Sequence, residues 1–277
     1  MIAWTDYETG SHRIECPSCG RGGRDKTAGL TMEIDGKGVM HCFRCSYAES
    51  HHPDCGTAVR RVPTIKPSHK PQTEQHQRLS DWGRNLWRNC HPLSGIALQY
   101  LRSRRCAIPP AYGHLRWHPS MKHPSGYVGP ALVALITDVE TGEHLSLHRT
   151  WITPTGKANL DTPRLPLWNH STKNGVIRLW PDDEVNALLG IAEGIETALS
   201  LAWAPLPVWA TIDAGHMSKF PVLPGIRTLV IAQDQDPAGI VAAMTCAARW
   251  VTAGREVIAT RQAANDLNDV LTEAANV

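Results

Sequence analysis

Apolar positions in the middle of the chain follow first a helical and then a strand period. Residues 81–106 carry apolar side chains at helical spacing, and Pro92 divides them into two short helices because proline lacks the backbone N–H of a helix interior. Residues 131–136 are a continuous apolar run, residues 140–143 are typical of a turn, and residues 145–152 predict a returning strand. We therefore expect two helices followed by a hairpin or meander.

Beyond Pro181 the pattern changes to strands that alternate with helices. Short apolar runs predict strands, and longer stretches with an apolar stripe predict helices; the strands are expected at 188–192, 207–212, 228–232 and 256–260, and the helices at 195–204 and 238–253. Such alternation is typical of a mostly parallel sheet with helices on both faces. The fold class expected for this region is α/β, and the whole chain is expected to be α+β.

The first 80 residues lack such periods. Residues 1–50 contain two cysteine pairs and many glycines, whereas residues 51–80 are polar and rich in proline, which is typical of an extended, semi-flexible linker. We therefore divide the chain into segments 1–50, 51–80, 81–180 and 181–277.

Composition and charge restrict the function classes. The chain of 277 residues is 42% hydrophobic and 19% charged, with a formal net charge of +2, so a nucleic-acid surface would have to come from local clusters of basic residues. No apolar run is long enough to cross a bilayer, and the acidic N-terminus lacks the basic start of a secretory signal. These features favour a cytoplasmic protein without a membrane partner.

Two C-x-x-C pairs predict a structural zinc site. Cys16 and Cys19 form the first pair, Cys42 and Cys45 form the second, and residues 20–41 lie between them. Two such knuckles can place four thiolates tetrahedrally around one zinc ion, within a small β-ribbon. Nearby basic residues make this ribbon a candidate nucleic-acid reader, and a solvated surface around a structural metal is the alternative.

Acidic residues follow three of the expected strands. Glu193 follows the first, Asp234 and Asp236 follow the third, and Asp266 and Asp269 follow the fourth after a short loop. The carboxyl ends of parallel strands lie at one edge of a sheet, so these side chains are expected to converge there. Clustered carboxylates repel one another unless a cation neutralises them, and hard oxygen ligands select Mg²⁺ or Mn²⁺. The pattern favours metal-dependent phosphoryl chemistry.

These motifs resemble the Toprim domain that is shared by primases, topoisomerases and related nucleases. Their local residue sequences are similar to those of phage and mobile-element primases. The matching segments are Ala192–Leu199, Asp234–Gly239, Asp266–Leu271 and the ribbon motif His41–Cys45, together with Trp87, Tyr100–Arg104 and His148–Trp151 in the middle. The resemblance covers nearly the whole chain. It implies a stand-alone DNA primase that makes short primers on a single-stranded DNA template from nucleoside triphosphates.

The resemblance also implies residue roles. Glu193 would be a metal ligand or the general base that activates the 3′-hydroxyl, and Asp234 and Asp236 would bind the divalent ions. Asp266 would complete the acidic site, with Asp269 as a further ligand. Four basic residues of the middle region and its border, the basic N-terminal subdomain of a polymerase domain, would line the nucleotide and template groove: Arg149, Lys157, Arg164 and Arg178.

Two details depart from the family pattern. The third Toprim motif is often Asp-x-Asp, whereas Asp266 and Asp269 are three residues apart, so which of them ligates the metal stays open. Glu196 lies one helical turn after Glu193 and could face the site. The sequence contains no P-loop, so a separate replicative helicase is expected as a partner. A Toprim nuclease and a non-catalytic recombination mediator with a zinc module remain the alternative functions.

Overall fold

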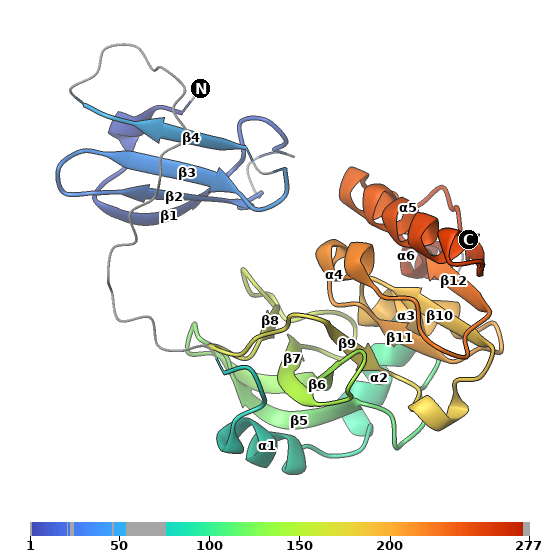
Figure 1. Ribbon diagram of the computed structural model, residues 1–277. Coiled ribbons are helices and arrows are strands. Elements are labelled where there is room, and N and C mark those ends of the chain that lie inside the picture. Colours follow the sequence, from blue (N-terminus) through green and yellow to red (C-terminus); the bar gives the residue numbers. More distant parts are fainter. Residues whose placement is uncertain (1, 21, 23–24, 46, 54–75, 274–277) are drawn as a thin grey trace. The chain divides into compact units, whose positions relative to one another are not determined.

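The computed structural model describes residues 2–20, 22, 25–45, 47–53 and 76–273 (Figure 1). They belong to two compact units, one within residues 1–70 and the other within residues 71–277. Residues 54–75, which make up most of the stretch expected to be a linker, lie outside the described residues. None of the helices in the described part of the chain is long and apolar enough to span a membrane.

The N-terminal unit is a four-stranded antiparallel sheet in the order β1-β2-β3-β4. Its elements are η1 (Trp4–Asp6), β1 (Gly10–Ile14), β2 (Ala28–Met32), β3 (Gly38–Cys42) and β4 (Ala48–His51). Side chains of β2 and β3 alternate between buried and accessible, so one face of the sheet packs Leu30 and Met40 against Trp4. The small β-ribbon expected from the sequence is thereby confirmed.

The larger unit contains a nine-stranded mixed sheet in the order β13-β12-β10-β11-β9-β6-β7-β8, with β5 paired to β6. Its strands are β5 (Leu115–Lys122), β6 (Val128–Asp138), β7 (His144–Trp151), β8 (Arg164–Pro166), β9 (Gly175–Arg178), β10 (Leu188–Ala192), β11 (Val208–Ala210), β12 (Thr228–Ala232) and β13 (Glu256–Ala259). Its helices are α1 (Asp81–Arg88), α2 (Gly95–Ser103), η2 (Asp182–Glu184), α3 (Ile195–Leu201), α4 (Ala214–Lys219), α5 (Pro237–Thr252) and α6 (Leu267–Glu273).

The C-terminal part of this sheet is parallel, as expected. Strand β10 pairs in parallel with β11 and β12, and β12 pairs in parallel with β13. One apolar cluster joins these strands to α2 and α3, and a second joins them to α4 and α5 on the other face. The α/β fold class is thus confirmed.

Two elements are shorter than the sequence pattern predicts. The strand expected over 207–212 ends at Ala210, because Ile212 has a φ of +77° and leaves the extended conformation. The helix expected over 195–204 ends at Leu201, and Pro205 follows shortly after.

Antiparallel pairing of β9 with β11 joins the middle region to the parallel strands. Trp209 lies opposite Arg178, and Ala210 lies opposite Ile177. The sequence pattern does not anticipate this pairing. It makes the helix-and-hairpin region and the parallel region two halves of one continuous sheet.

Candidate functional site

The four cysteines of the two knuckles come together at one end of the N-terminal sheet. The Sγ atoms of Cys16 and Cys45 are 3.6 Å apart, and those of Cys19 and Cys42 are 3.7 Å apart. A tetrahedral zinc ion with Zn–S bonds of about 2.3 Å separates its sulfurs by about 3.8 Å. The observed spacing therefore fits one zinc ion, and the four cysteines are the residues that would hold it.

Backbone and side-chain bonds hold the knuckles in this arrangement. The amides of Ser18 and Arg44 donate to the sulfurs of Cys16 and Cys42, each over 3.4 Å. The Arg44 guanidinium donates to both carboxylate oxygens of Asp25, at 2.7 and 3.1 Å. Arg44 thus braces the metal site and is not a free basic group.

An aromatic and basic patch lies on the solvent-facing side of the same sheet. The Arg13 guanidinium lies 4.7 Å from the centre of the Phe43 ring, and the His41 ring meets Phe43 edge-on at 5.2 Å. Phe43 is 66% exposed, so its ring is accessible to a ligand. Such a combination of an exposed ring and a guanidinium is suited to stacking against nucleic-acid bases.

In the larger unit, the acidic side chains follow neighbouring parallel strands. Glu193 comes directly after β10, and Asp234 comes two residues after the end of β12, whose Ala232 pairs with Ala192. Asp236 caps α5: its Oδ1 accepts from the Gly239 amide over 2.7 Å. The structure therefore brings these three acids to the carboxyl edge of β10 and β12.

Burial, together with repulsion among the acids, raises the pKa values of two of them. Burial raises the pKa of Glu193 to about 7, and the charges of Asp234, Asp236 and Asp213 add to the shift. Burial likewise raises the pKa of Asp234 to about 7, with added repulsion from Asp266 and Asp236. Such shifts at a group of neighbouring carboxylates mark a candidate functional site.

Asp266 and Asp269 differ in their surroundings. Asp266 is the strongest charged neighbour of Asp234, and its Oδ1 accepts from the Asp269 amide over 2.9 Å. Asp269 lies 3.6 Å from the Arg104 guanidinium and acts more weakly on Asp234. The geometry thus favours Asp266 over Asp269 as the third acidic position.

Glu196 turns into the protein interior. Its Oε1 accepts from the Tyr100 hydroxyl over 2.5 Å and lies 3.1 Å from the Lys157 ammonium. Burial opposes the charge, but Lys157 and Tyr100 outweigh it and lower the pKa of the Glu196 carboxyl. Glu196 therefore forms an ion pair with Lys157, buried on the side of Glu196 and partly exposed on the side of Lys157, next to the acidic edge.

The remaining expected basic residues have separate positions. Arg164 is exposed on β8, and its charge lowers the pKa of both Glu193 and Asp234, so it lies within electrostatic reach of the acids. Arg149 is 8% exposed and donates to the Pro166 carbonyl over 2.8 Å. Its guanidinium lies over the Trp151 ring.

Arg178 is also withdrawn from solvent. Its guanidinium donates to Asp182, to the Thr137 hydroxyl and to the carbonyls of Asp138 and Val139, and it lies over the Trp209 ring. The placement of Arg178 in a nucleotide groove is therefore not supported, because its hydrogen bonds tie β9 to the end of β6 and to Asp182. A buried arginine with local partners is a structural element of the sheet.

Sequence reasoning missed Asp213. This residue follows β11 and adds to the repulsion that raises the pKa of Glu193. Its Oδ1 accepts from the His216 amide over 2.9 Å, so on its own it resembles an ordinary helix cap. Its position after a strand next to β10 was the available signal.

The acidic edge has the chemistry of a divalent-cation site without a closed cage. The Oδ1 atom of Asp234 is buried and has no hydrogen-bond partner, and a cation would satisfy such an oxygen. Over the described residues, only the four cysteines form a group whose candidate ligand atoms all lie within 4.8 Å of one another. Glu193, Asp234, Asp236 and Asp266 are the residues that would hold Mg²⁺ or Mn²⁺.

Comparison with known families bears on both halves of the large unit. Residues 188–276 match the family described as Toprim domain. The C-terminal region is a Toprim domain. Residues 77–179 match a family described as a domain of unknown function, DUF7146. The chain thus joins an N-terminal four-cysteine cluster to a Toprim domain, as the sequence motifs indicate.

Two solved structures are similar to the chain over most of its length. The primase fragment of the bacteriophage T7 primase-helicase protein is 16% identical, with 95% of each chain covered and a TM-score of 0.45. The zinc-binding and RNA polymerase domains of the Aquifex aeolicus primase are 13% identical, with 98% of this chain and 80% of that chain covered and a TM-score of 0.43. A search of curated proteins finds no matching relative. Because both TM-scores are below 0.5, neither likeness decides the function of this chain.

Proposed function

We propose that this protein is a DNA primase that synthesises short primers on single-stranded DNA. The observation that carries the proposal is the convergence of Glu193, Asp234, Asp236 and Asp266 at one edge of a Toprim domain, on a chain that also carries the four-cysteine module. The acids supply the chemistry of phosphoryl transfer, and the module supplies a nucleic-acid surface.

Glu193 is suited to act as the general base. A base works best when its pKa lies near the working pH, and in the metal-free protein burial and the neighbouring acids raise the pKa of Glu193 to about 7. Its carboxylate would take the proton of the primer 3′-hydroxyl as that oxygen attacks the α-phosphorus of the incoming nucleotide. Pyrophosphate leaves as the new phosphodiester bond forms.

Asp234, Asp236 and Asp266 would bind the divalent cations at this edge. When bound, these ions supply positive charge for the triphosphate and for the attacking and leaving oxygens. Arg164 would add a basic group toward the phosphates, since it acts electrostatically on both Glu193 and Asp234. Lys157 would act indirectly, through its ion pair with Glu196 in the first helix after Glu193.

The exposed patch of Arg13, His41 and Phe43 would contact the template. The ring of Phe43 offers a stacking surface, and Arg13 offers a guanidinium for phosphates or bases. Single-stranded DNA, nucleoside triphosphates and a separate replicative helicase are the partners that this function requires, and the cytoplasm is the compartment in which it would act.

Primer synthesis on single-stranded templates tests the proposal. The protein is incubated with templates of varied sequence, labelled nucleotides and Mg²⁺, and the products are separated by length. Short products are expected, and Glu193→Gln and Asp234→Asn should each reduce them by about 10²-fold or more. The matched control is Asp183→Asn, an exposed acid in η2 ahead of β10, which should leave synthesis unchanged.

Two results would overturn the proposal. Cleavage of the template by the wild-type protein, lost in Glu193→Gln, would identify a Toprim nuclease. DNA binding without any product, unaffected by Glu193→Gln and Asp234→Asn, would identify a binding module.

A further inference from the structure

A pocket of about 540 Å³ lies beside the acidic edge, at the carboxyl end of β11. It is lined by the loop that follows β6, the segment that leads into β9, and α4 with the residues after it. Its volume is within the range of about 300–1,000 Å³ that is typical of small-molecule sites. None of the residues expected from the sequence to act in the function lines this pocket.

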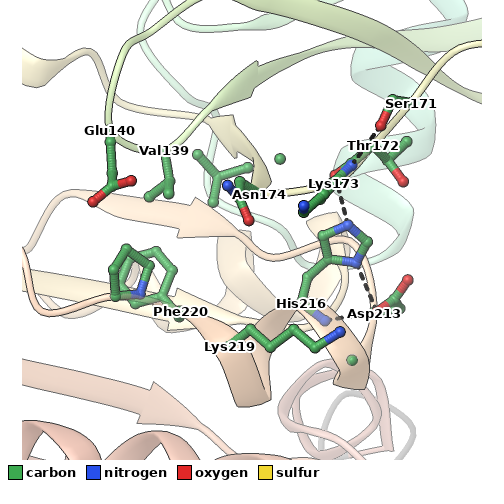
Figure 2. A pocket seen from close by; sticks show the side chains of 14 residues that line it. Val139, Glu140, Ser171, Thr172, Lys173, Asn174, Asp213, His216, Lys219 and Phe220 are labelled. Atoms are coloured by element: carbon green, nitrogen blue, oxygen red, sulfur yellow. Dashed lines mark hydrogen bonds and ion pairs between the residues drawn. The ribbon is translucent and has the colours of Figure 1, made fainter. Parts of the chain in front are cut away.

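The two ends of the pocket differ in chemistry. Figure 2 shows Lys173, Asn174, His216 and Lys219 toward one end, and Val139, Glu140 and Phe220 toward the other. In the part of the chain that the structure describes, neither the Lys173 nor the Lys219 ammonium takes part in an ion pair. Both lysine side chains are exposed and can turn toward an anion.

His216 and Asp213 form a close pair at the lysine end. The Nδ1 atom of His216 lies 2.8 Å from Asp213 Oδ1, and its Nε2 lies 2.7 Å from the Thr172 carbonyl oxygen. Both of these oxygens are acceptors, so the protonated ring satisfies both, while the Asp213 carboxylate balances its charge and the two lysines supply the excess positive charge. Burial lowers the pKa of His216, but the bonds to Asp213 and Thr172 outweigh it, and the pKa is raised.

The other end of the pocket combines apolar side chains with a hydrogen-bond acceptor, which suits the base and ribose of a nucleoside. Val139 and Phe220 form an apolar floor, and Glu140 is an exposed acceptor beside them. Ribose hydroxyls and base amino groups are donors that such a carboxylate can accept from. A ligand with an anionic end and a donor-rich, partly apolar end matches this division.

We propose that the pocket binds a nucleoside triphosphate, with its phosphates toward Lys173 and Lys219 and its nucleoside toward Glu140, as a second nucleotide site next to the catalytic acids. The proposal rests on the proposed function for its choice of ligand. The pocket and the catalytic edge meet at Asp213, which lines the pocket and also acts electrostatically on Glu193.

Nucleotide binding without metal separates this site from the catalytic acids. In EDTA the acidic edge repels triphosphates, whereas the lysine end of the pocket still attracts them. The probe is an ATP analogue with a fluorescent group on the ribose, titrated against the full chain, with unlabelled ATP, inorganic tripolyphosphate and a single-stranded oligonucleotide as competitors.

The double variant Lys173→Ala/Lys219→Ala should weaken binding of the probe by tenfold or more, because it removes the two cationic side chains that would contact the phosphates. Lys122→Ala is the matched control, an exposed lysine on β5 of the same unit, and should bind like the wild type. Asp234→Asn should bind at least as tightly as the wild type. ATP should displace the probe better than tripolyphosphate, and Glu140→Gln should reduce that preference.

Unchanged binding in the double variant would overturn the proposal. So would displacement of the probe by the oligonucleotide but not by ATP, since the surface would then belong to nucleic acid. Equal displacement by tripolyphosphate and ATP would overturn the nucleoside part. If no primers form on any template, the proposed function fails, yet loss of probe binding in the double variant would still establish the pocket.

Discussion

The two candidate metal sites of this chain are built in opposite ways. In the N-terminal unit, the sulfurs of the four cysteines already stand at zinc-like spacing, and backbone amides fix two of them. At the Toprim edge, the carboxylates serve partly as helix caps, repel one another, and leave a buried oxygen of Asp234 without a partner.

The cysteine cluster is suited to a metal ion that stabilises the fold of the N-terminal unit. The acidic edge is suited to a metal ion that binds to a sheet that is already folded. A closed tetrahedral set of thiolates leaves no position for a substrate, so its ion can only stabilise the unit around it. Carboxylates that are held by the rigid sheet, and that lack a closed cage, can share their cation with phosphates. Stability should therefore depend on the first site, and activity on the second.

The largest expected effect follows from breaking the cysteine cluster. Cys42→Ser should reduce zinc content from about one ion per chain to well below that value, and the N-terminal unit should lose its fold. Metal binding supplies about 10–16 kcal/mol to small zinc domains, far more than a four-stranded sheet of this size can replace. Metal analysis and amide NMR of the N-terminal strands measure both outcomes.

Cys90→Ser provides the control for this change. The Cys90 thiol is buried in the larger unit and donates to the Leu86 carbonyl, a bond that a serine hydroxyl can also make. This variant should keep its zinc. Equal zinc content in Cys42→Ser and the wild type would show that the cluster does not hold the ion.

A smaller effect of opposite sign is expected at the acidic edge. Because the pKa of Asp234 is raised in the folded protein, its ionised form destabilises the metal-free fold, and this cost grows as the pH rises from about 4 to about 7. Asp234→Asn should therefore raise the free energy of unfolding by about 1–2 kcal/mol at pH 8 in EDTA. At pH 3 the difference should nearly vanish, since the wild-type carboxyl is then largely protonated in both the folded and the unfolded state.

Thermal unfolding at the two pH values measures this linkage. Addition of Mg²⁺ at pH 8 should raise the Tm of the wild type more than that of Asp234→Asn. A lower Tm for Asp234→Asn at pH 8 in EDTA would contradict the repulsion. Asp183→Asn should change the Tm little at either pH.

The smallest expected effect concerns the glycine of the Asp-x-Asp-x-Ala-Gly motif. A Cβ at Gly239 would lie 2.8 Å from the Cβ of Asp234, so Gly239→Ala should push Asp234 out of place. The steric cost of about 1–3 kcal/mol should exceed the gain of about 1 kcal/mol from the better helix propensity of alanine. A net loss of stability of about 1 kcal/mol and reduced primer synthesis are expected.

Gly156→Ala is the matched control, because a Cβ there would meet nothing within 4 Å. Denaturant unfolding and the primer assay compare the two variants. A Gly239→Ala protein with wild-type synthesis would show that the close approach of α5 to Asp234 does not position this acid.

Sequence reasoning succeeded where a local pattern determines the structure. The strands β10 and β12 are apolar runs followed within two residues by acids, so both the sheet and its edge could be predicted from Glu193 and Asp234. The spacing of the cysteine pairs likewise predicts a closed cluster. In each case the signal lies within a few neighbouring residues.

The features that sequence reasoning missed depend on contacts between residues that are far apart in the chain. Arg178 looks like any basic residue near a nucleotide groove, and only the pairing of β9 with β6 reveals that Thr137, as well as Asp182, holds its guanidinium. Glu196 faces Tyr100, a partner 96 positions away in the chain. Asp213 looks like a simple helix cap until β11 is placed beside β10.

The pairing of β9 with β11 also has a consequence for modularity. Two separate family matches meet across these strands, so cutting the chain between them would expose the backbone edge of β11 and uncover the Trp209 ring that Arg178 overlies. We therefore expect that the Toprim domain of this chain cannot be moved by itself into another protein. The receiving protein would have to supply a strand that pairs with β11 in place of β9.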